Sequence, residues 1–367
     1  MEKRSRKEKN KKSKTKIYII TILLIIILAG VFLAFKITNG NQNNPQEVGN
    51  IEGNVKPQEI VKEEVQIFKG TDRPIAVMID NHNGAWPQAG IQDAYMVYEI
   101  IVEGSETRLI ALFKGQDTKN IGPVRSARHY FLDYAMENDA TYAHFGQSPQ
   151  AKSDLKKFDI DDINGIAEDG TTFWRVNTKS APHNSITSIK NLVKSAENKK
   201  YKTKSTEKSI LNYQTDEVDL ENGKLIKSVT IPHSSLQKVK YVYDEGNKVF
   251  ERYARNVAQK DLNTGKVITT KNIIITFADN YTLDDPENKG RQGLKNIGTF
   301  DGYYITNGRA IKIKCIKDSR SSKTKYQDLD GNEIKVNDGN TFVNICSTNT
   351  KVIFEELADE TNVNNGV

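Results

Sequence analysis

The sequence lacks the short motifs that mark most enzymes of known chemistry. It has two cysteines and five histidines, and it contains no Cys-x-x-Cys pair, Gly-x-Ser-x-Gly elbow or glycine-rich phosphate loop. The histidines are not spaced like zinc ligands. In the aspartate-rich segment 160–171, Ile160 and Thr171 occupy the first and last ligand positions of a calcium loop. These absences predict no metal and no cofactor, and they weigh against an enzyme without excluding one.

Positive charge is scarce outside one short segment. The net charge is +6, but residues 1–16 contain nine Lys or Arg against two Glu and so carry +7 by themselves. The remaining 351 residues therefore carry about −1. A folded part without positive excess lacks the electrostatic signature of nucleic-acid binding, so no nucleic-acid partner is expected.

One uncharged segment, residues 17–35, is nineteen residues long. As a helix it would measure about 28 Å, close to the roughly 30 Å of a bilayer core. The basic residues 1–16 precede it, so the positive-inside rule places them in the cytoplasm and the rest of the chain outside. No small-x-small cleavage site follows, and residues 28–31, Leu-Ala-Gly-Val, resemble a lipoprotein processing box without its cysteine. We expect a retained signal anchor that makes the protein a single-pass membrane protein.

The residues after this segment divide by composition and pattern. Asn, Gln, Gly and Glu dominate the first part, strands and helices alternate in the second, and short strands with turns fill the later part. The expected divisions are a disordered tether at 36–66, a first domain at 67–199, a polar linker at 200–227, a β-rich second domain at 228–347 and a polar tail at 348–367.

The first domain is expected to be α/β or α+β. Residues 75–79 are apolar on both faces, which is typical of a strand buried in the middle of a sheet. Residues 94–104 predict a second central strand, and residues 107–115 its antiparallel partner. From residue 228 onward, short strands alternate with turns such as Asp-Gly pairs, so an all-β second domain is predicted.

The two cysteines, Cys315 and Cys346, fall in this second domain. Outside the cytoplasm a disulfide between them is permitted. Alternatively, both are small buried apolar residues of a core.

Acidic residues at two strands are candidates for acid–base chemistry. Asp80 and Asn81 follow the first buried strand, where open α/β sheets bind ligands, although a polar turn explains them equally well. Glu99 lies in the second strand and is expected to be buried, with a salt bridge to Arg108 or Arg125 as the simplest explanation. Glu103 lies about 13 Å further along that strand, beyond the spacing of glycosidase carboxylates.

Two predicted helix starts carry unusual charges. Residues 122–138 read as a helix whose first turn holds Arg125, Ser126 and Arg128, where cations are disfavoured unless an anion binds. The alternative is that these arginines pair with Glu99, Glu103 or Asp133. Before a later helix, His183 and Asn184 would also lie at an electropositive start, although a single histidine there is more often structural.

Several of these motifs together resemble the YerB-like family of lipoprotein-type bacterial proteins. The segments are RPIAVMIDN, YEIIVEGSETR, IGPVRSAR and APHN in the first domain, and GRAIKIK and DGNTFVNI in the second. The resemblance covers about residues 68–347. It implies an envelope location and a two-domain ectodomain, but no reaction, because the family has no known function. Val31 stands where the family has its lipidated cysteine.

The leading hypothesis is a membrane-anchored envelope protein that binds an anionic ligand, such as cell-wall peptide carboxylates or wall-polymer phosphates. The expected ligand-binding residues are Arg125, Ser126, Arg128, Asn81, Arg108 and Asn184. One alternative is a peptidoglycan hydrolase or transglycosylase, for which the catalytic candidates are Asp80, Glu99 and His183. A second alternative is a scaffold for other envelope proteins in a membrane complex.

Overall fold

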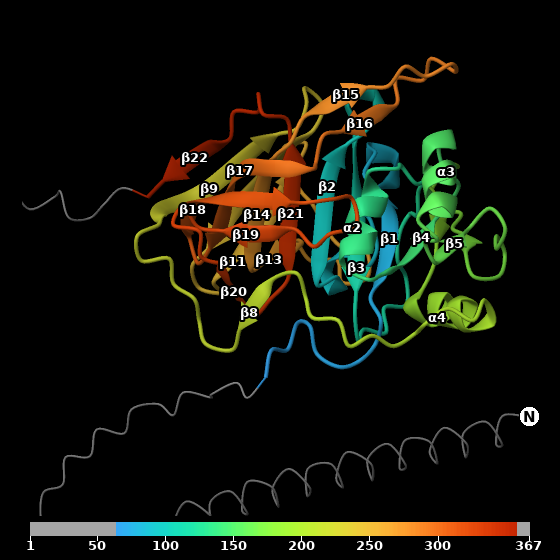
Figure 1. The fold of residues 1–367 in the computed structure, drawn as a ribbon, viewed down its shortest axis with the longest axis horizontal. Helices are drawn as coiled ribbons and strands as arrows, with labels where there is room; N and C mark the ends of the chain where they lie inside the picture. The colour runs from blue at the N-terminus through green and yellow to red at the C-terminus, as the bar shows by residue number, and fades with distance from the viewer. Residues whose placement is uncertain (1–63, 358–367) are drawn as a thin grey trace, which may run out of the picture. The chain divides into compact units, whose positions relative to one another are not determined.

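A computed structural model describes residues 64–357 (Figure 1). The basic segment, the predicted span at 17–35, nearly all of the predicted tether and the end of the polar tail lie outside these residues. Within residues 64–357, no helix combines the length and apolarity needed to cross a membrane.

The first domain is a mixed α/β structure. Its strands are β1 (Ile75–Asp80), β2 (Met96–Ile101), β3 (Thr107–Phe113), β4 (Thr141–His144), β5 (Asp162–Asn164), β6 (Trp174–Arg175) and β7 (Ser185–Ile186). Its helices are α2 (Phe131–Glu137), α3 (Pro149–Lys157) and α4 (Ile189–Asn198), with short 3-10 turns η1 (Asn83–Ala85), η2 (Ile91–Asp93) and η3 (Glu103–Ser105). The first two predicted strands are confirmed, and β3 pairs with both of them in antiparallel fashion, as expected.

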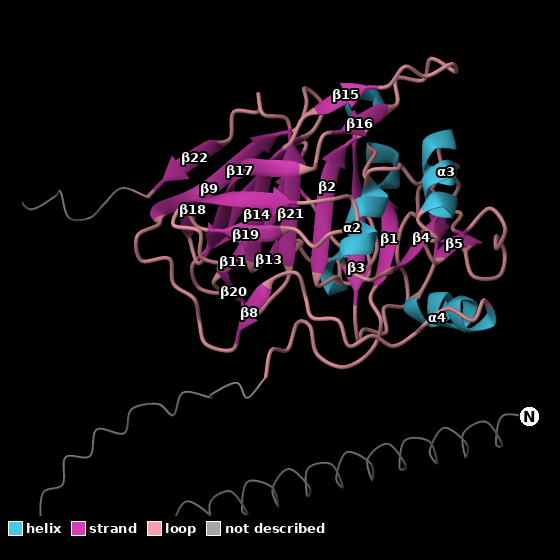
Figure 2. Cartoon of the chain, in the orientation of Figure 1, coloured by secondary structure: helices cyan, strands magenta, loops and turns pink. Residues whose placement is uncertain are grey.

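The second half of the chain is β-rich. Its strands are β8 (Asn212–Gln214), β9 (Lys224–Pro232), β10 (Lys238–Asp244), β11 (Val249–Ala254), β12 (Val257–Ala258), β13 (Thr269–Thr270), β14 (Asn272–Phe277), β15 (Asn280–Thr282), β16 (Gln292–Leu294), β17 (Gly298–Thr306), β18 (Arg309–Lys317), β19 (Lys325–Gln327), β20 (Lys335–Asn337), β21 (Thr341–Cys346) and β22 (Ile353–Glu356). Figure 2 shows the helices gathered over the part of the sheet formed by the first domain. The second part is formed by strands and loops.

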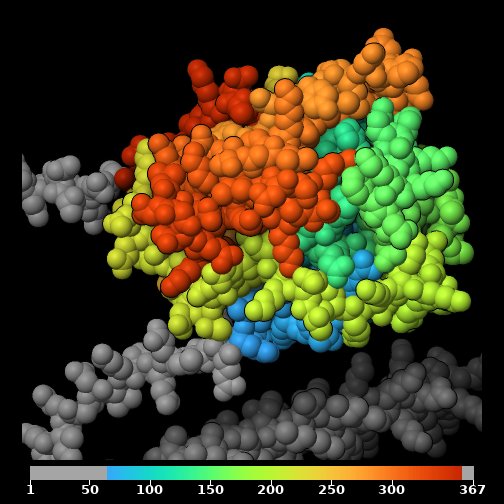
Figure 3. All heavy atoms as spheres, in the orientation of Figure 1, coloured from blue at the N-terminus to red at the C-terminus, as the bar shows by residue number. Residues whose placement is uncertain are grey.

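One sheet runs through both domains. The strand order is β12-β11-β10-β9-β18-β17-β14-β21-β2-β3-β1-β4-β5. Strand β21 of the second domain lies between β14 and β2 and pairs with both in parallel orientation. On the face seen in Figure 3, the two halves of the chain lie directly against each other. The two-domain division of the sequence therefore does not correspond to two separate sheets.

The central strands are apolar at successive positions, so they present apolar side chains to both faces of the sheet, and both faces are buried. On one face, side chains such as Met78 and Tyr98 pack beneath α2. On the other face, side chains such as Val77 and Val97 belong to a second core that continues into the β-rich domain through Phe250. The predicted linker is packed against the body as well, since Leu211 and Tyr213 are buried there.

One expectation from the sequence is wrong, and one of two alternatives that it left open is excluded. The helix predicted at 122–138 begins only at Phe131, because the preceding residues pair with the end of β1 and with neighbouring loops instead. For the two cysteines the alternative of buried core residues is confirmed, because Cys315 and Cys346 are free and buried. They lie three strand positions apart, about 14 Å at normal strand spacing, and in the cores on opposite faces of the sheet.

Candidate functional site

Three loops meet where β1 ends. The backbone N–H of Asp80 donates to the carbonyl of Pro123 at 2.9 Å, and that of Arg125 donates to the carbonyl of Met78 at 2.8 Å. The N–H of Val124 donates to the carbonyl of Ser185 at 2.6 Å. These backbone contacts bring Asp80, Arg125 and His183 together although they are distant in the sequence.

Asp80 is the centre of this arrangement and is only 3% exposed. Its Oδ2 lies 2.7 Å from Nδ1 of His183 and 3.4 Å from Nε of Arg125. Its Oδ1 accepts a hydrogen bond of 3.0 Å from the backbone N–H of His82. We call Asp80, His82, Arg125 and His183 the Asp80 cluster. A buried carboxylate needs such partners, and here it gains both a cation and an imidazole.

The two histidines of the cluster stack on each other. Their ring centroids are 4.5 Å apart and the ring planes differ by 10°. The backbone N–H of Gly84 donates to Nδ1 of His82 at 3.1 Å. A Cβ at Gly84 would lie 3.1 Å from Cδ2 of His183 and 3.2 Å from Nδ1 of His82. Glycine at this position therefore allows both rings to approach the same turn.

Beside the cluster lies a second charged group formed by Arg108, Arg128 and Glu103. Nε of Arg128 donates to Glu103 at 3.0 Å, and a terminal nitrogen of Arg108 lies 3.5 Å from the same carboxylate. Arg108 also donates to the carbonyl of Ser126. Burial lowers the pKa of Arg108 to about 10, and the nearby charges of Arg128 and Arg125 contribute to this. Positive charge is therefore in excess at this end of the sheet.

Glu103 makes the stability of this region dependent on pH. Burial opposes its ionisation, but the hydrogen bond from Arg128 and the charges of Arg108 and Arg128 outweigh burial and hold its pKa at about 2, below the ordinary 4.5. The stabilisation is therefore complete above about pH 5 and is lost as the pH falls toward 2. In urea unfolding, we expect the difference in unfolding free energy between the natural protein and Glu103→Gln to shrink over this range.

Glu245→Gln is the control for that measurement, because Glu245 is exposed and makes no ion pair with any of residues 64–357. The difference in unfolding free energy between Glu245→Gln and the natural protein should not shrink as the pH falls from 5 to 2. If the difference in unfolding free energy between Glu103→Gln and the natural protein stayed constant between pH 5 and 2, the lowered pKa of Glu103 would be contradicted.

The remaining predicted site residues have other roles. Ser126 donates its hydroxyl to the carbonyl of Phe145 at 3.0 Å, and Asn184 accepts from Arg175 at 2.9 Å. The Asn81 amide donates to Glu99 at 3.1 Å. Each of these side chains is occupied by a contact within the protein.

Glu99 is not open to a substrate, which corrects its place among the catalytic candidates. It is fully buried, as expected, but its partner is Arg252 of the second domain at 2.6 Å rather than Arg108 or Arg125. Sequence reasoning missed Arg252 and also missed the pairing of His82 with His183. No local spacing could have revealed either contact, because 153 residues separate Glu99 from Arg252.

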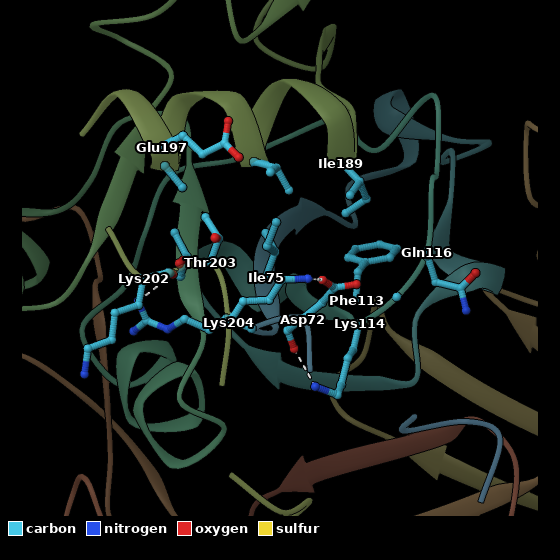
Figure 4. Close-up of a pocket in the computed structure, with 15 residues that line it drawn as sticks. Asp72, Ile75, Phe113, Lys114, Gln116, Ile189, Glu197, Lys202, Thr203 and Lys204 are labelled. Atoms are coloured by element: carbon cyan, nitrogen blue, oxygen red, sulfur yellow. Dashed lines mark hydrogen bonds and ion pairs between the residues drawn. The ribbon is translucent and has the colours of Figure 1, made fainter. Parts of the chain in front are cut away.

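A cavity of about 220 Å³ lies elsewhere, at the start of β1 (Figure 4). Its apolar lining comes from Ile75, Phe113 and the residues Ile189 and Val193 of α4. At its rim Asp72 is engaged, since its carbonyl accepts from Lys114 and its carboxylate pairs with Lys204. Asp80 lies at the other end of β1, about 17 Å along the strand. The cavity is therefore separate from the Asp80 cluster.

Comparisons with known proteins agree with this architecture. Residues 62–202 match the family described as "Protein of unknown function (DUF3048) N-terminal domain", and residues 229–343 match its C-terminal domain. The chain is 33% identical over 268 residues to "Putative lipoprotein YerB" of Bacillus subtilis (strain 168), covering 73% of this chain and 76% of the relative.

The crystal structure of the YerB protein from Bacillus subtilis superposes on this structure with a TM-score of 0.70 and 30% sequence identity. The superposition covers 80% of this chain and 97% of that chain. The resemblance drawn from the sequence motifs is confirmed. The chain belongs to the YerB-like family of proteins of unknown function, with both of its DUF3048 domains.

Proposed function

We propose that this chain is an extracytoplasmic protein of the bacterial envelope that binds an anionic group of a cell-wall polymer at the Asp80 cluster. The uncharged segment 17–35 and the name of the Bacillus relative, "Putative lipoprotein YerB", support the location at the outer face of the membrane. The ligand-binding part of the proposal depends on the geometry around Arg125.

The observation that carries the proposal is the unused hydrogen-bonding capacity of Arg125. Its side chain is 26% exposed, and its one charged contact is Nε with Asp80 at 3.4 Å. Among residues 64–357, no acceptor satisfies its two terminal amino groups. A guanidinium with two free parallel donors fits a carboxylate or a phosphate. The excess of positive charge from Arg108 and Arg128 favours such an anion further.

The structure changes the set of residues assigned to this ligand. Arg128 is 8% exposed and engaged with Glu103, and the hydroxyl of Ser126 is engaged with Phe145. The anion therefore meets the free amino groups of Arg125, next to the stacked rings of His82 and His183. The helix dipole contributes nothing here, because α2 starts only at Phe131.

The proposal is tested by binding of the purified protein to insoluble cell walls in a sedimentation assay. Arg125→Ala should weaken binding about 10- to 100-fold, because charge-assisted hydrogen bonds contribute about 1.5–3 kcal/mol. Walls stripped of their phosphate polymers should be compared with untreated walls. Binding that is lost on stripping identifies phosphate as the anion, whereas binding that remains identifies peptide carboxylates.

Lys312→Ala is the matched control, because it removes one positive charge from an exposed side chain in the second domain. It should leave wall binding nearly unchanged. If a folded Arg125→Ala protein bound walls as tightly as the natural protein, Arg125 would not be the anion-binding residue.

A further inference from the structure

The two stacked histidines are held in opposite protonation patterns. A backbone N–H can only donate, so Nδ1 of His82 must accept from Gly84, and the ring proton of neutral His82 is then on Nε2. A carboxylate accepts, so Nδ1 of His183 carries a proton toward Asp80, and Nε2 of neutral His183 is left with a lone pair. One ring thus presents a donor and its neighbour presents a base.

We propose that the Asp80 cluster hydrolyses an acyl ester carried by an anionic polymer, with His183 as the general base and His82 as a hydrogen-bond donor to the oxyanion. The inference rests on the proposed function in one respect: Arg125 holds the anionic group of the polymer. Asp80 orients His183 and stabilises its imidazolium form, as a buried carboxylate does in other histidine-based sites.

The reaction needs only the ester, water and the side chains of the Asp80 cluster. Water attacks the ester carbonyl carbon while its proton passes to Nε2 of His183, and the carbonyl electrons move to the oxygen. Nε2–H of His82 donates a hydrogen bond to that oxyanion and keeps its proton throughout. When the carbon–oxygen bond to the alcohol breaks, Nε2–H of His183 returns the proton to the alkoxide. The products are a carboxylic acid and an alcohol.

The geometry favours acyl transfer over the other hydrolytic reactions. Phosphoryl transfer places the nucleophile and the leaving group on opposite sides of phosphorus, so a single imidazole does not serve both readily. Glycoside hydrolysis requires two carboxylates that flank the bond. Here Asp80 is buried and engaged, and Glu99 is sealed in its pair with Arg252. In acyl transfer, one imidazole takes and returns the proton on the same face.

The test measures acetate released from O-acetylated cell walls and hydrolysis of 4-nitrophenyl acetate as a soluble probe. His183→Gly should lower kcat at least 100-fold, and added imidazole should restore part of it, which a merely structural role would not allow. His82→Phe keeps a stacking ring but removes the donor. It should lower kcat about 100-fold with little change in KM.

His129→Ala is the matched control, because His129 is half-buried and lies outside the Asp80 cluster. It should release acetate at the natural rate. Release that persists in folded His183→Gly protein, or no release from either substrate by the natural protein, overturns the inference. Wall binding decides the proposed function separately: if Arg125-dependent binding persists without release, only the catalytic inference fails, and if both are missing, both fail.

Discussion

Replacing Arg252 with leucine should lower the free energy of unfolding by about 3–5 kcal/mol, because it leaves a carboxylate unpaired in the core. Arg252 and Glu99 are both fully buried, and their charged atoms are 2.6 Å apart. The guanidinium also donates to Gln259 at 2.6 Å and lies 4.9 Å from the ring centroid of Phe342. Burial alone would raise the pKa of Glu99, but the charge of Arg252 keeps it lowered. Urea unfolding of the purified protein measures the loss.

The exposed pair of Lys314 and Asp301 provides the control. Its atoms are 2.6 Å apart, but the side chains are 44% and 75% exposed. Lys314→Leu should therefore cost less than about 1 kcal/mol. Replacing Glu99 and Arg252 together with leucine should cost less than Arg252→Leu alone, because no charge is then left unpaired. If Arg252→Leu lowered the free energy of unfolding no more than Lys314→Leu does, the pair of Glu99 and Arg252 would not be shielded from water.

Replacing Glu137 with leucine should have a similar effect on the opposite face of the sheet. Glu137 belongs to α2, and its Oε2 lies 2.7 Å from Nζ of Lys317 in β18. The same carboxylate accepts from the hydroxyl of Thr324 at 2.6 Å and from that of Tyr98 at 2.7 Å. The side chains of Glu137 and Lys317 are at most 3% exposed. Leaving Lys317 buried and unpaired should cost about 3–5 kcal/mol in the same unfolding assay.

Glu207→Leu is the reference for this second experiment, because Glu207 pairs with Lys323 at 2.8 Å on the surface and is 58% exposed. Its cost should stay below about 1 kcal/mol. The double replacement of Glu137 and Lys317 by leucine should recover part of the loss. If Glu137→Leu and Glu207→Leu lower the free energy of unfolding equally, the pair of Glu137 and Lys317 is not shielded from water.

The two buried ion pairs explain how the domains are joined. Each pair connects a residue of the first domain with one of the second, and the pairs lie in the cores on opposite faces of the shared sheet. Replacing one partner of a pair leaves the charge of the other buried and unpaired. Since the partners belong to different domains, each domain needs the other to neutralise its buried charge. We therefore regard the two family domains as one folding body.

Sequence reasoning succeeded where local pattern decides structure. The apolar run before Asp80 predicts a strand buried on both faces, and β1 is buried in this way. The short strands and turns of the later residues likewise predict the β-rich second domain. It failed at residues 122–128, where a proline after glycine and a polar first turn imitate a helix start. Backbone pairing of Val124 and Arg125 with distant segments outweighs that local preference.

The candidate site was predicted only in part for the same reason. The sequence indicates Asp80, Arg125 and His183 separately, because each lies in a motif or at a strand end. Their convergence depends on contacts between segments about 45 to 103 positions apart, which no local period encodes. The stacking of His82 on His183 is likewise a tertiary contact, made possible by the missing side chain at Gly84.

The place of β21 in the sheet also determines when the protein can finish folding. Met96 of β2 pairs with Thr341 of β21, about 245 positions later in the chain. While the chain is being made from its N-terminus, β2 has an open edge on that side, and such edges pair readily with other chains. Contacts of this range close slowly. The first domain therefore has to remain unaggregated until nearly the whole chain has been made.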